Sequence, residues 1–391
     1  MIVTAPAPAL TPLETATAIL FGRAGETAPL QRRTDRSPME ALELALLEAL
    51  RHTPCLVAFS GGRDSSALLA VAARVAREHG LAPPVPVTLR FPEAGLTAED
   101  EWQELVVERL GLEEWLRLEH RDELDLIGPE ARRVMAWDGL PYPYNLHLLL
   151  PMLEAAGGGA LVTGVGGDQV LNAAGRELDV LAGRVRPVPR DSLRLAAGAA
   201  PPALRRTLLR RRIRLTLPWL SAAGNEALTE AALEQEARRR LRWDARLREM
   251  WRSRVFRLML GRIDSLGRHV DALAVHPFLD PRFMAALSTA GGATGFADRT
   301  AAMRALFAGD LPDRVNTRAT KAGFDEVLFN RHSKAYVDAL DEERLAALLA
   351  GLEAGELVDP AALLAHWRTE RPIANSFLLL QACRLAAGER G

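Results

Sequence analysis

The chain has 391 residues, of which 48% are hydrophobic and 25% charged, with a formal net charge of −1; this is the composition of a globular protein with one large or two to three smaller domains. Its two cysteines indicate neither a disulfide framework nor a zinc site. The N-terminus lacks the basic and apolar regions of a signal peptide, and no apolar run reaches the ~18 residues of a membrane helix, so we expect a cytoplasmic protein without a membrane partner.

Residues 1–50 are expected to form a short N-terminal segment that packs beside a sheet. Within it, Ser37 and Glu40 have the spacing of a helix-capping box, and Pro38 stands at the first helical position. This pattern predicts a helix from Pro38 to about Arg51.

Residues 51–180 alternate between short apolar runs and helical patterns. Such alternation predicts a doubly wound parallel α/β sheet. The expected strands are 55–59, 85–91, 114–120 and 159–167. The expected helices are 65–79, 99–110, 122–137 and 145–156.

Residues 181–391 lack clear strand signals and are expected to form a mainly helical region that completes the protein. Within it, residues 186–262 carry 19 arginines against 7 acidic residues. The favoured interpretation is the exposed faces of amphipathic helices. The alternative is a surface for an anionic partner, such as an acidic peptide, a tRNA or a phosphorylated cofactor.

A glycine-rich turn, SGGRDS, joins the first predicted strand to its helix at residues 60–65. In an open parallel sheet, ligands bind at the carboxyl ends of the strands, and a helix N-terminus offers N–H groups to phosphate. Asp64 in such a turn suggests a Mg²⁺ ion between the carboxylate and the phosphate. The lysine of a Walker-type phosphate loop is absent.

Four segments in order resemble the motifs of the N-type ATP pyrophosphatases of the asparagine synthetase and β-lactam synthetase superfamily. They are SGGRDSS at 60–66, TGVGGDQVL at 163–171, VHPFLDPRF at 275–283 and RATKAGF at 318–324. The last has one extra residue after its arginine. Together they extend over roughly residues 55–330, and they imply an AMP-forming carbon–nitrogen ligase that adenylates a carboxylate and transfers it to an amine.

The resemblance also implies a set of site residues. Asp64 and Asp168 would hold Mg²⁺ on ATP, and Lys321 would stabilise the leaving pyrophosphate or the charge that develops in acyl transfer. Lys321 is one of only two lysines in the chain, with Lys334. The nucleotide would be bound by Ser60, Gly61, Gly62, Asp64, Ser65, Gly164, Gly166 and Asp168.

The chain also departs from the superfamily pattern. Ile2 stands where glutamine-dependent members carry a catalytic cysteine, so we expect no glutaminase domain. Val165 replaces a tyrosine or glutamate, and the glutamate before PFLD is missing. His276 and Asp271 are the candidate bases in its place. These departures are similar to those of lasso-peptide cyclases, which implies macrolactam formation in a peptide natural product.

Several alternatives remain open. One is an ammonia-dependent asparagine-type synthetase with a separate amidotransferase partner; others are a tRNA-modifying enzyme and a nucleotide-binding protein without catalysis. Asp100 and Glu101 are either near the substrate or favourable charges in a first helical turn. The expected partners are a small-molecule or peptide carboxylate, an amine and a candidate peptide carrier, without nucleic acid.

Overall fold

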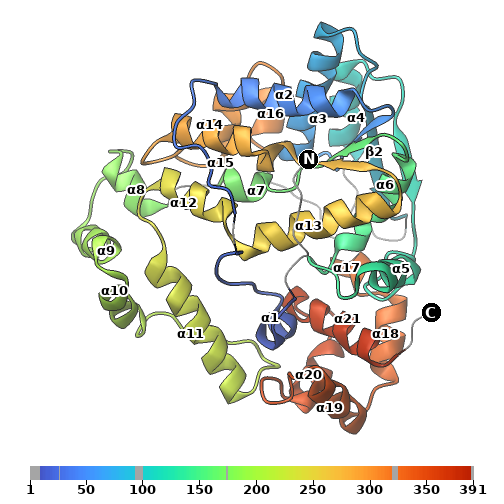
Figure 1. Cartoon of the computed structure of the whole chain (residues 1–391), viewed down its shortest axis with the longest axis vertical. Helices are drawn as coiled ribbons and strands as arrows, with labels where there is room; N and C mark the ends of the chain where they lie inside the picture. The colour runs from blue at the N-terminus through green and yellow to red at the C-terminus, as the bar shows by residue number, and fades with distance from the viewer. Residues whose placement is uncertain (1–8, 26, 93–99, 173–174, 319–324, 389–391) are drawn as a thin grey trace.

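The computed structural model describes residues 9–25, 27–92, 100–172, 175–318 and 325–388. At its centre is a parallel sheet with the strand order β3-β2-β1-β4-β5 (Figure 1). Its strands are β1 (Cys55–Ala58), β2 (Val85–Arg90), β3 (Leu116–Glu119), β4 (Ala160–Val162) and β5 (Leu273–Val275). The predicted fold class, a doubly wound parallel sheet followed by a mainly helical region, is confirmed.

Helices bury both faces of the sheet. Alternate residues of β1 and β4 point to opposite sides, so Val57 and Val162 belong to one apolar cluster while Leu56 and Leu161 belong to another. This two-sided burial explains why the strands read as continuous apolar runs rather than alternating ones. The helices of this half are α2 (Pro38–Leu50), α3 (Arg63–Glu78), α4 (Asp100–Leu110), α5 (Pro129–Asp138), η2 (Leu146–Leu149), α6 (Leu150–Ala155) and α7 (Gly167–Val170).

The strand β5 was not predicted, because residues beyond 180 were expected to be helical. It pairs in parallel with β4, with Ala160 opposite Leu273 and Val162 opposite Val275. Three residues are too few to show a period, and only the neighbouring strand makes them extended. The expected helix at 122–137 begins only at Pro129, and the expected strand at 159–167 ends at Val162.

The remaining helices surround this core. They are α8 (Arg176–Leu181), α9 (Pro189–Ala199), α10 (Pro202–Leu209), α11 (Ala222–Arg238), α12 (Trp243–Trp251), α13 (Arg254–His269), η3 (Pro277–Leu279), α14 (Pro281–Gly291), α15 (Arg299–Phe307), α16 (Asp313–Asn316), α17 (Asp325–Leu328), α18 (Arg331–Asp338), α19 (Glu342–Gly351), α20 (Pro360–Trp367), η4 (Ala374–Ser376) and α21 (Phe377–Ala386). Among the described residues, no helix is both long and apolar enough to cross a bilayer.

The N-terminal segment is divided between two parts of the molecule. As expected, α2 packs beside the sheet, against α3 and α14. The first helix, α1 (Pro12–Thr17), instead packs against α21 near the C-terminus (Figure 1). There the indole Nε1 of Trp219 donates a hydrogen bond of 2.9 Å to the Ala16 carbonyl.

Candidate functional site

The two glycine-rich turns lie side by side at one edge of the sheet. One follows β1 and the other follows β4, and these two strands are neighbours. The strand order also reverses between them, because β2 and β3 lie on one side and β5 on the other. The carboxyl ends of strands at such a reversal form the usual ligand crevice of an open α/β sheet.

The first turn presents the bare N-terminus of α3. Gly61 has a φ of +79°, a conformation that favours glycine. Gly62 is the N-cap, and no side chain caps the helix. The hydroxyls of Ser60 and Ser65 lie 3.3 Å apart beside it. Free helical N–H groups, two hydroxyls and the helix dipole together form an anion-binding site suited to phosphate.

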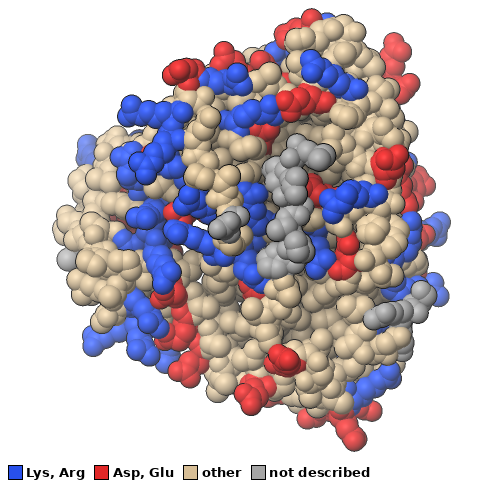
Figure 2. Space-filling model, in the orientation of Figure 1, with Lys and Arg blue, Asp and Glu red and all other residues tan. Residues whose placement is uncertain are grey.

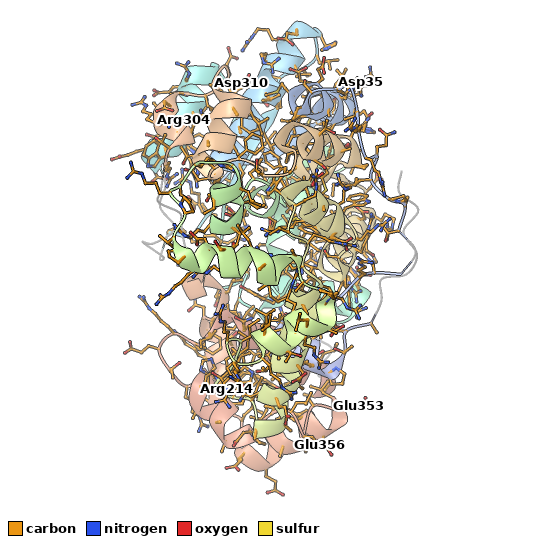
Figure 3. All side chains as sticks on the ribbon, turned by 90° about the vertical axis from the view of Figure 1, so that its left-hand side faces the viewer. Asp35, Arg214, Arg304, Asp310, Glu353 and Glu356 are labelled. Carbon is orange, nitrogen blue, oxygen red and sulfur yellow. The ribbon has the colours of Figure 1, made fainter. Side chains whose placement is uncertain are left out.

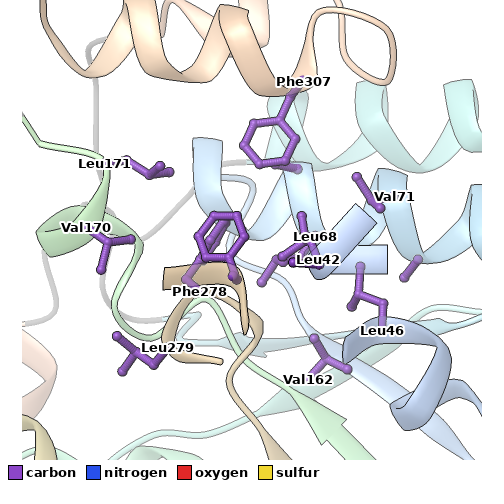
Figure 4. Packing of buried hydrophobic residues seen from close by; sticks show 14 of the residues in the cluster. Leu42, Leu46, Leu68, Val71, Val162, Val170, Leu171, Phe278, Leu279 and Phe307 are labelled. Atoms are coloured by element: carbon purple, nitrogen blue, oxygen red, sulfur yellow. The ribbon is translucent and has the colours of Figure 1, made fainter. Parts of the chain in front are cut away.

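The second turn places Asp168 in the first turn of the short helix α7. Gly166 has a φ of +93°, and Leu279 of the PFLD segment lies directly against it. A Cβ on Gly166 would lie 2.5 Å from the Leu279 Cδ2 atom. The same leucine lies with Val170 and Leu171 in the apolar layer below the site, where Phe278 packs near Phe307 (Figure 4). The PFLD segment therefore supports the second turn from below.

One guanidinium joins the two expected metal ligands. Arg299, the first residue of α15, contacts the Asp64 carboxylate at 2.5 Å and also forms an ion pair with Asp168. These aspartates come from different turns and are 104 residues apart in the sequence (168 − 64). Both carboxylates therefore face the same guanidinium. Their role as metal ligands stays a prediction.

The donor set fits a magnesium ion shared with a nucleotide. The Asp64 Oδ1 atom is buried and has no hydrogen-bond partner in the part of the chain that the structure describes. No group of three or more His, Cys, Asp or Glu side chains among those residues could hold a metal without help. Mg²⁺ commonly takes one or two carboxylates and completes its coordination with phosphate oxygens and water, which this pair allows.

Other side chains hold the first turn in place. Gln103 donates a hydrogen bond of 3.1 Å to the Ser60 carbonyl, and Arg318 donates one of 2.8 Å to the Gly61 carbonyl. The Arg318 guanidinium also lies 5.0 Å from the centroid of the Trp102 ring. Within the turn, the Ser60 N–H donates to the Ser65 hydroxyl and the Gly62 N–H to the Ser60 hydroxyl, each at 3.3 Å. These contacts fix the shape of the turn at the start of α3.

Arg63 and Arg318 add to the positive charge of Arg299 at this edge of the sheet. Arg63 donates a hydrogen bond of 3.3 Å to Thr300, next to Arg299. Burial, and then the neighbouring charge of Arg299, lower the pKa of the Arg63 guanidinium. Arg63, Arg299 and Arg318 outnumber the two aspartates, as a site for a polyphosphate requires.

His276 follows β5 and contacts the second turn. Its Nδ1 atom lies 2.6 Å from the Thr163 hydroxyl, which also accepts a 3.4 Å hydrogen bond from the Val165 N–H. Burial lowers the pKa of His276 to about 4. The imidazole is therefore neutral at neutral pH and has a direct role in holding the turn; its role as a base stays a prediction.

The other predicted residues have different outcomes. Lys321 lies outside the described residues. Asp271 precedes β5 and so lies at the amino edge of the parallel sheet, opposite the crevice, which removes it as a candidate base. Asp100 forms an ion pair with Arg90, and Asp280 caps α14 by accepting a hydrogen bond from the Arg282 N–H.

Sequence reasoning missed Arg299, Arg63 and Gly167 as parts of the site. Arg299 is 235 residues from Asp64, and the only local signal near it is Asp298, an N-cap that marks a helix start. Arg63 and Gly167 lie inside the two turns, but the sequence of a turn does not show which residues of other segments they contact. For Gly167 the neighbour is Asp64.

One of two comparisons with known proteins identifies a family. A family model described as asparagine synthase matches residues 40–382, which include both turns, the PFLD segment and Arg299. A comparison with curated protein sequences gave no match.

Proposed function

The chain belongs to the asparagine synthase family of ATP-dependent, amide-forming ligases, and from this we propose that it activates a carboxylate as an acyl-adenylate and transfers the acyl group to an amine. The observation that carries the proposal is the meeting of Asp64 and Asp168 at Arg299, beside the uncapped N-terminus of α3. That arrangement offers one place for metal-bound phosphate and another for free phosphate oxygens.

In the first step, an oxygen of the substrate carboxylate attacks the α-phosphorus of ATP. The bond between the α-phosphorus and the bridging oxygen breaks, and pyrophosphate leaves with both electrons of that bond. The uncapped N–H groups at the start of α3 and the hydroxyls of Ser60 and Ser65 would bind the β- and γ-phosphates and hold the α-phosphate in line with the attacking oxygen. Catalysis then comes mainly from positioning and charge stabilisation.

Asp64 and Asp168 would hold Mg²⁺, which neutralises charge on the polyphosphate. With both carboxylates bound to the metal ion, Arg299 would lose its ion pairs with them. Its guanidinium would then contact the pyrophosphate as negative charge develops there. A guanidinium can bind two phosphate oxygens at once. Arg63, beside Arg299, would add a second cation at the same end.

In the second step, the amine attacks the acyl carbon, the bond from that carbon to the phosphate oxygen breaks, and AMP departs with both electrons of that bond. The proton of the nitrogen would pass to water or to His276, the candidate base. Val165 and Leu273 carry no proton acceptor at the positions where the superfamily has one. We propose that the amine is the N-terminal amine of a peptide and that a side-chain carboxylate of the same peptide is adenylated. A macrolactam would be the product.

The test incubates the full chain with ATP, Mg²⁺ and separate pools of amino acids, small carboxylic acids and linear peptides with internal Asp or Glu. AMP and pyrophosphate are measured, and peptide products are examined for the loss of one water. We expect both products with one pool only, and none with Asp64→Ala or Asp168→Ala. Arg133→Ala is a control, because Arg133 is 43% exposed and pairs with Glu130 and with Glu154, which precedes β4 at the amino edge of the sheet.

ADP and phosphate instead of AMP and pyrophosphate would overturn the proposed chemistry. Turnover with aspartate and ammonia, but not with peptides, would replace the macrolactam by an asparagine-type reaction. ATP binding with no turnover in any pool would favour a nucleotide-binding protein without catalysis.

A further inference from the structure

A second feature of the chain lies away from this site. Residues 181–217, which we call the arginine-rich arm, contain ten arginines and a single acidic residue, Asp191. The arm includes α9 and α10 and forms one side of the molecule in Figure 1, and Figure 3 looks directly onto that side. Lys and Arg gather on the same half of the face shown in Figure 2.

The arm also exposes apolar side chains. Eight large apolar residues are exposed in the described part of the chain, and five of them belong to the arm: Leu181, Val188, Leu204, Leu208 and Leu215. Leu204 and Leu208 are 53% and 49% exposed, and their spacing of four places them on one face of α10. Scattered exposed leucines are ordinary, but a cluster with helical spacing is typical of a docking surface.

Polar contacts fix the opposite face of α10, so Leu204 and Leu208 face away from the rest of the protein. Arg205 donates from Nε to the Ala197 carbonyl at 3.1 Å, and Arg206 forms an ion pair with Glu230 of α11. No residue of α10 is buried. The helix is thus held against α11 by its polar side and directs its apolar side outward.

Arginines without acidic partners follow the leucines. Arg211, Arg212 and Arg214 are exposed, and none forms an ion pair with a described residue. Arg206 and Arg210 by contrast share Glu230. This end of the arm is therefore a row of unneutralised positive charges beside an apolar strip (Arg214 is labelled in Figure 3).

We propose that the arginine-rich arm docks an acidic amphipathic helix of a partner protein. Leu204 and Leu208 would contact the apolar face of that helix, and Arg211, Arg212 and Arg214 would pair with carboxylates along its edge. Helix recognition uses such anchors at i and i+4, and complementary charge sets orientation and speeds encounter. Residues 181–217 contain no aromatic residue on which a base could stack, so the arm does not fit single-stranded nucleic acid.

The test uses fluorescence anisotropy of a labelled synthetic helix of about 16 residues, long enough to form several turns. Its leucines have helical spacing and its other positions are mostly glutamate. We expect saturable binding to the full chain that weakens as salt is raised. Leu204→Ser with Leu208→Ser, and separately Arg211→Glu with Arg212→Glu, should each weaken binding at least about tenfold, which is about 1.4 kcal/mol.

Matched controls lie outside the arm. Ile373→Ser removes another exposed apolar side chain, and Arg32→Glu with Arg33→Glu makes the same change of net charge at exposed positions. Both should leave binding unchanged. Because α10 buries no residue, the arm variants should keep the wild-type melting temperature, which is measured alongside.

Three outcomes would overturn the proposal. One is equal binding of a peptide that has the same composition but scrambled leucine spacing. That result would mean that the arm attracts negative charge without recognising an apolar helix face. Another is an equal loss of binding in the control variants. The third is arm-dependent binding to phosphatidylserine vesicles or to a single-stranded oligonucleotide while the acidic helix does not bind.

Discussion

Gly167 lies so close to Asp64 that a side chain has no room there. A Cβ on Gly167 would lie 2.5 Å from the Asp64 Cγ atom. Gly167→Ala should therefore displace the Asp64 carboxylate and lower pyrophosphate release by about 100-fold, the usual effect of a shift near 1 Å in a catalytic group. The Mg²⁺ concentration for half-maximal rate should rise.

Gly309→Ala is the control for this substitution, since a Cβ added to Gly309 would meet no atom within 4 Å. Rates are measured as pyrophosphate release over a Mg²⁺ titration. A Gly167→Ala enzyme with wild-type rate and wild-type Mg²⁺ dependence would show that Asp64 is not a metal ligand.

His276 and Thr163 share one hydrogen bond, and this allows the two roles of His276 to be separated. Thr163→Val and His276→Leu both remove the 2.6 Å contact that holds the second turn. If His276 only positions the turn, both variants should lose activity equally, by about three- to tenfold for one hydrogen bond. The measurement is the rate of amide formation between pH 5 and pH 9.

A base role would give a different result. His276→Leu would then lose far more activity than Thr163→Val. Because the pKa of His276 is about 4, its own titration should contribute no inflection between pH 6 and pH 8 in either case. An inflection there that disappears in His276→Leu would contradict the neutral, buried imidazole.

Single residues of the site could be predicted from the sequence where a turn contains them. Ser60, Gly62, Asp64 and Asp168 were predicted from contiguous turn residues and from the family resemblance, and the structure brings their two turns to one edge of the sheet. Arg299 was not found because its role depends on α15 folding back over the sheet edge. No local pattern records that contact.

At the scale of elements, local chemistry predicted boundaries well where a cap or a buried run defines them. The capping box of Ser37 and Glu40 is present, and α2 begins at Pro38 as expected. In contrast, β5 has three residues and depends on β4 for its extended form. The segment 122–128 contains a turn, in which Asp125 accepts hydrogen bonds from Ser333 and Asn330. Such distant partners override local helical propensity.

The contact between η2 and the 122–128 turn should make the protein sensitive to acid. His147 on η2 is completely buried, and its Nε2 atom lies 2.9 Å from the Leu124 carbonyl oxygen. Burial lowers the pKa of His147 to about 4. The unfolded chain therefore takes up a proton near pH 6.5 while the folded chain does not, so stability is full above that pH and is lost as pH falls towards 4.

The effect on the free energy of unfolding is about 3.5 kcal/mol at most, because the pKa falls from 6.5 to about 4 and each pKa unit corresponds to about 1.4 kcal/mol. Melting temperatures of the wild type and His147→Gln are compared from pH 7.5 to pH 4.5. The variant should be less stable at pH 7.5 but should lose less of its stability on acidification. Parallel curves would mean that His147 is protonated in the folded state.

At the scale of the whole molecule, α1 connects parts of the chain that are far apart in sequence. Glu14 of α1 pairs with Arg254 of α13, the Ala16 carbonyl accepts from Trp219, and the Thr17 carbonyl accepts from Asn375. The sequence predicted that residues 181–391 are mainly helical, but it did not predict that α1 would contact this region. These contacts are made by one carboxylate and two backbone carbonyls of α1, and such groups give no recognisable sequence pattern.

The ion pair of Glu14 should be the most sensitive part of this closure. The two side chains are only 7% and 17% exposed, and Arg254 holds both carboxylate oxygens, at 2.7 Å and 3.0 Å. Glu14→Gln leaves the Arg254 charge largely buried without its partner, so it should reduce the free energy of unfolding by about 2–4 kcal/mol. Because α1 packs on α21, amide hydrogen exchange in α21 should also accelerate.

Glu154→Gln provides the matched comparison. It breaks the pair with Arg133, whose side chains are 40% and 43% exposed, and should cost less than about 1 kcal/mol. Urea denaturation gives both free energies, and hydrogen exchange shows where each variant opens. Equal costs for the two variants, or a Glu14→Gln protein whose α21 exchanges at the wild-type rate, would mean that α1 does not stabilise the C-terminal helices through this ion pair.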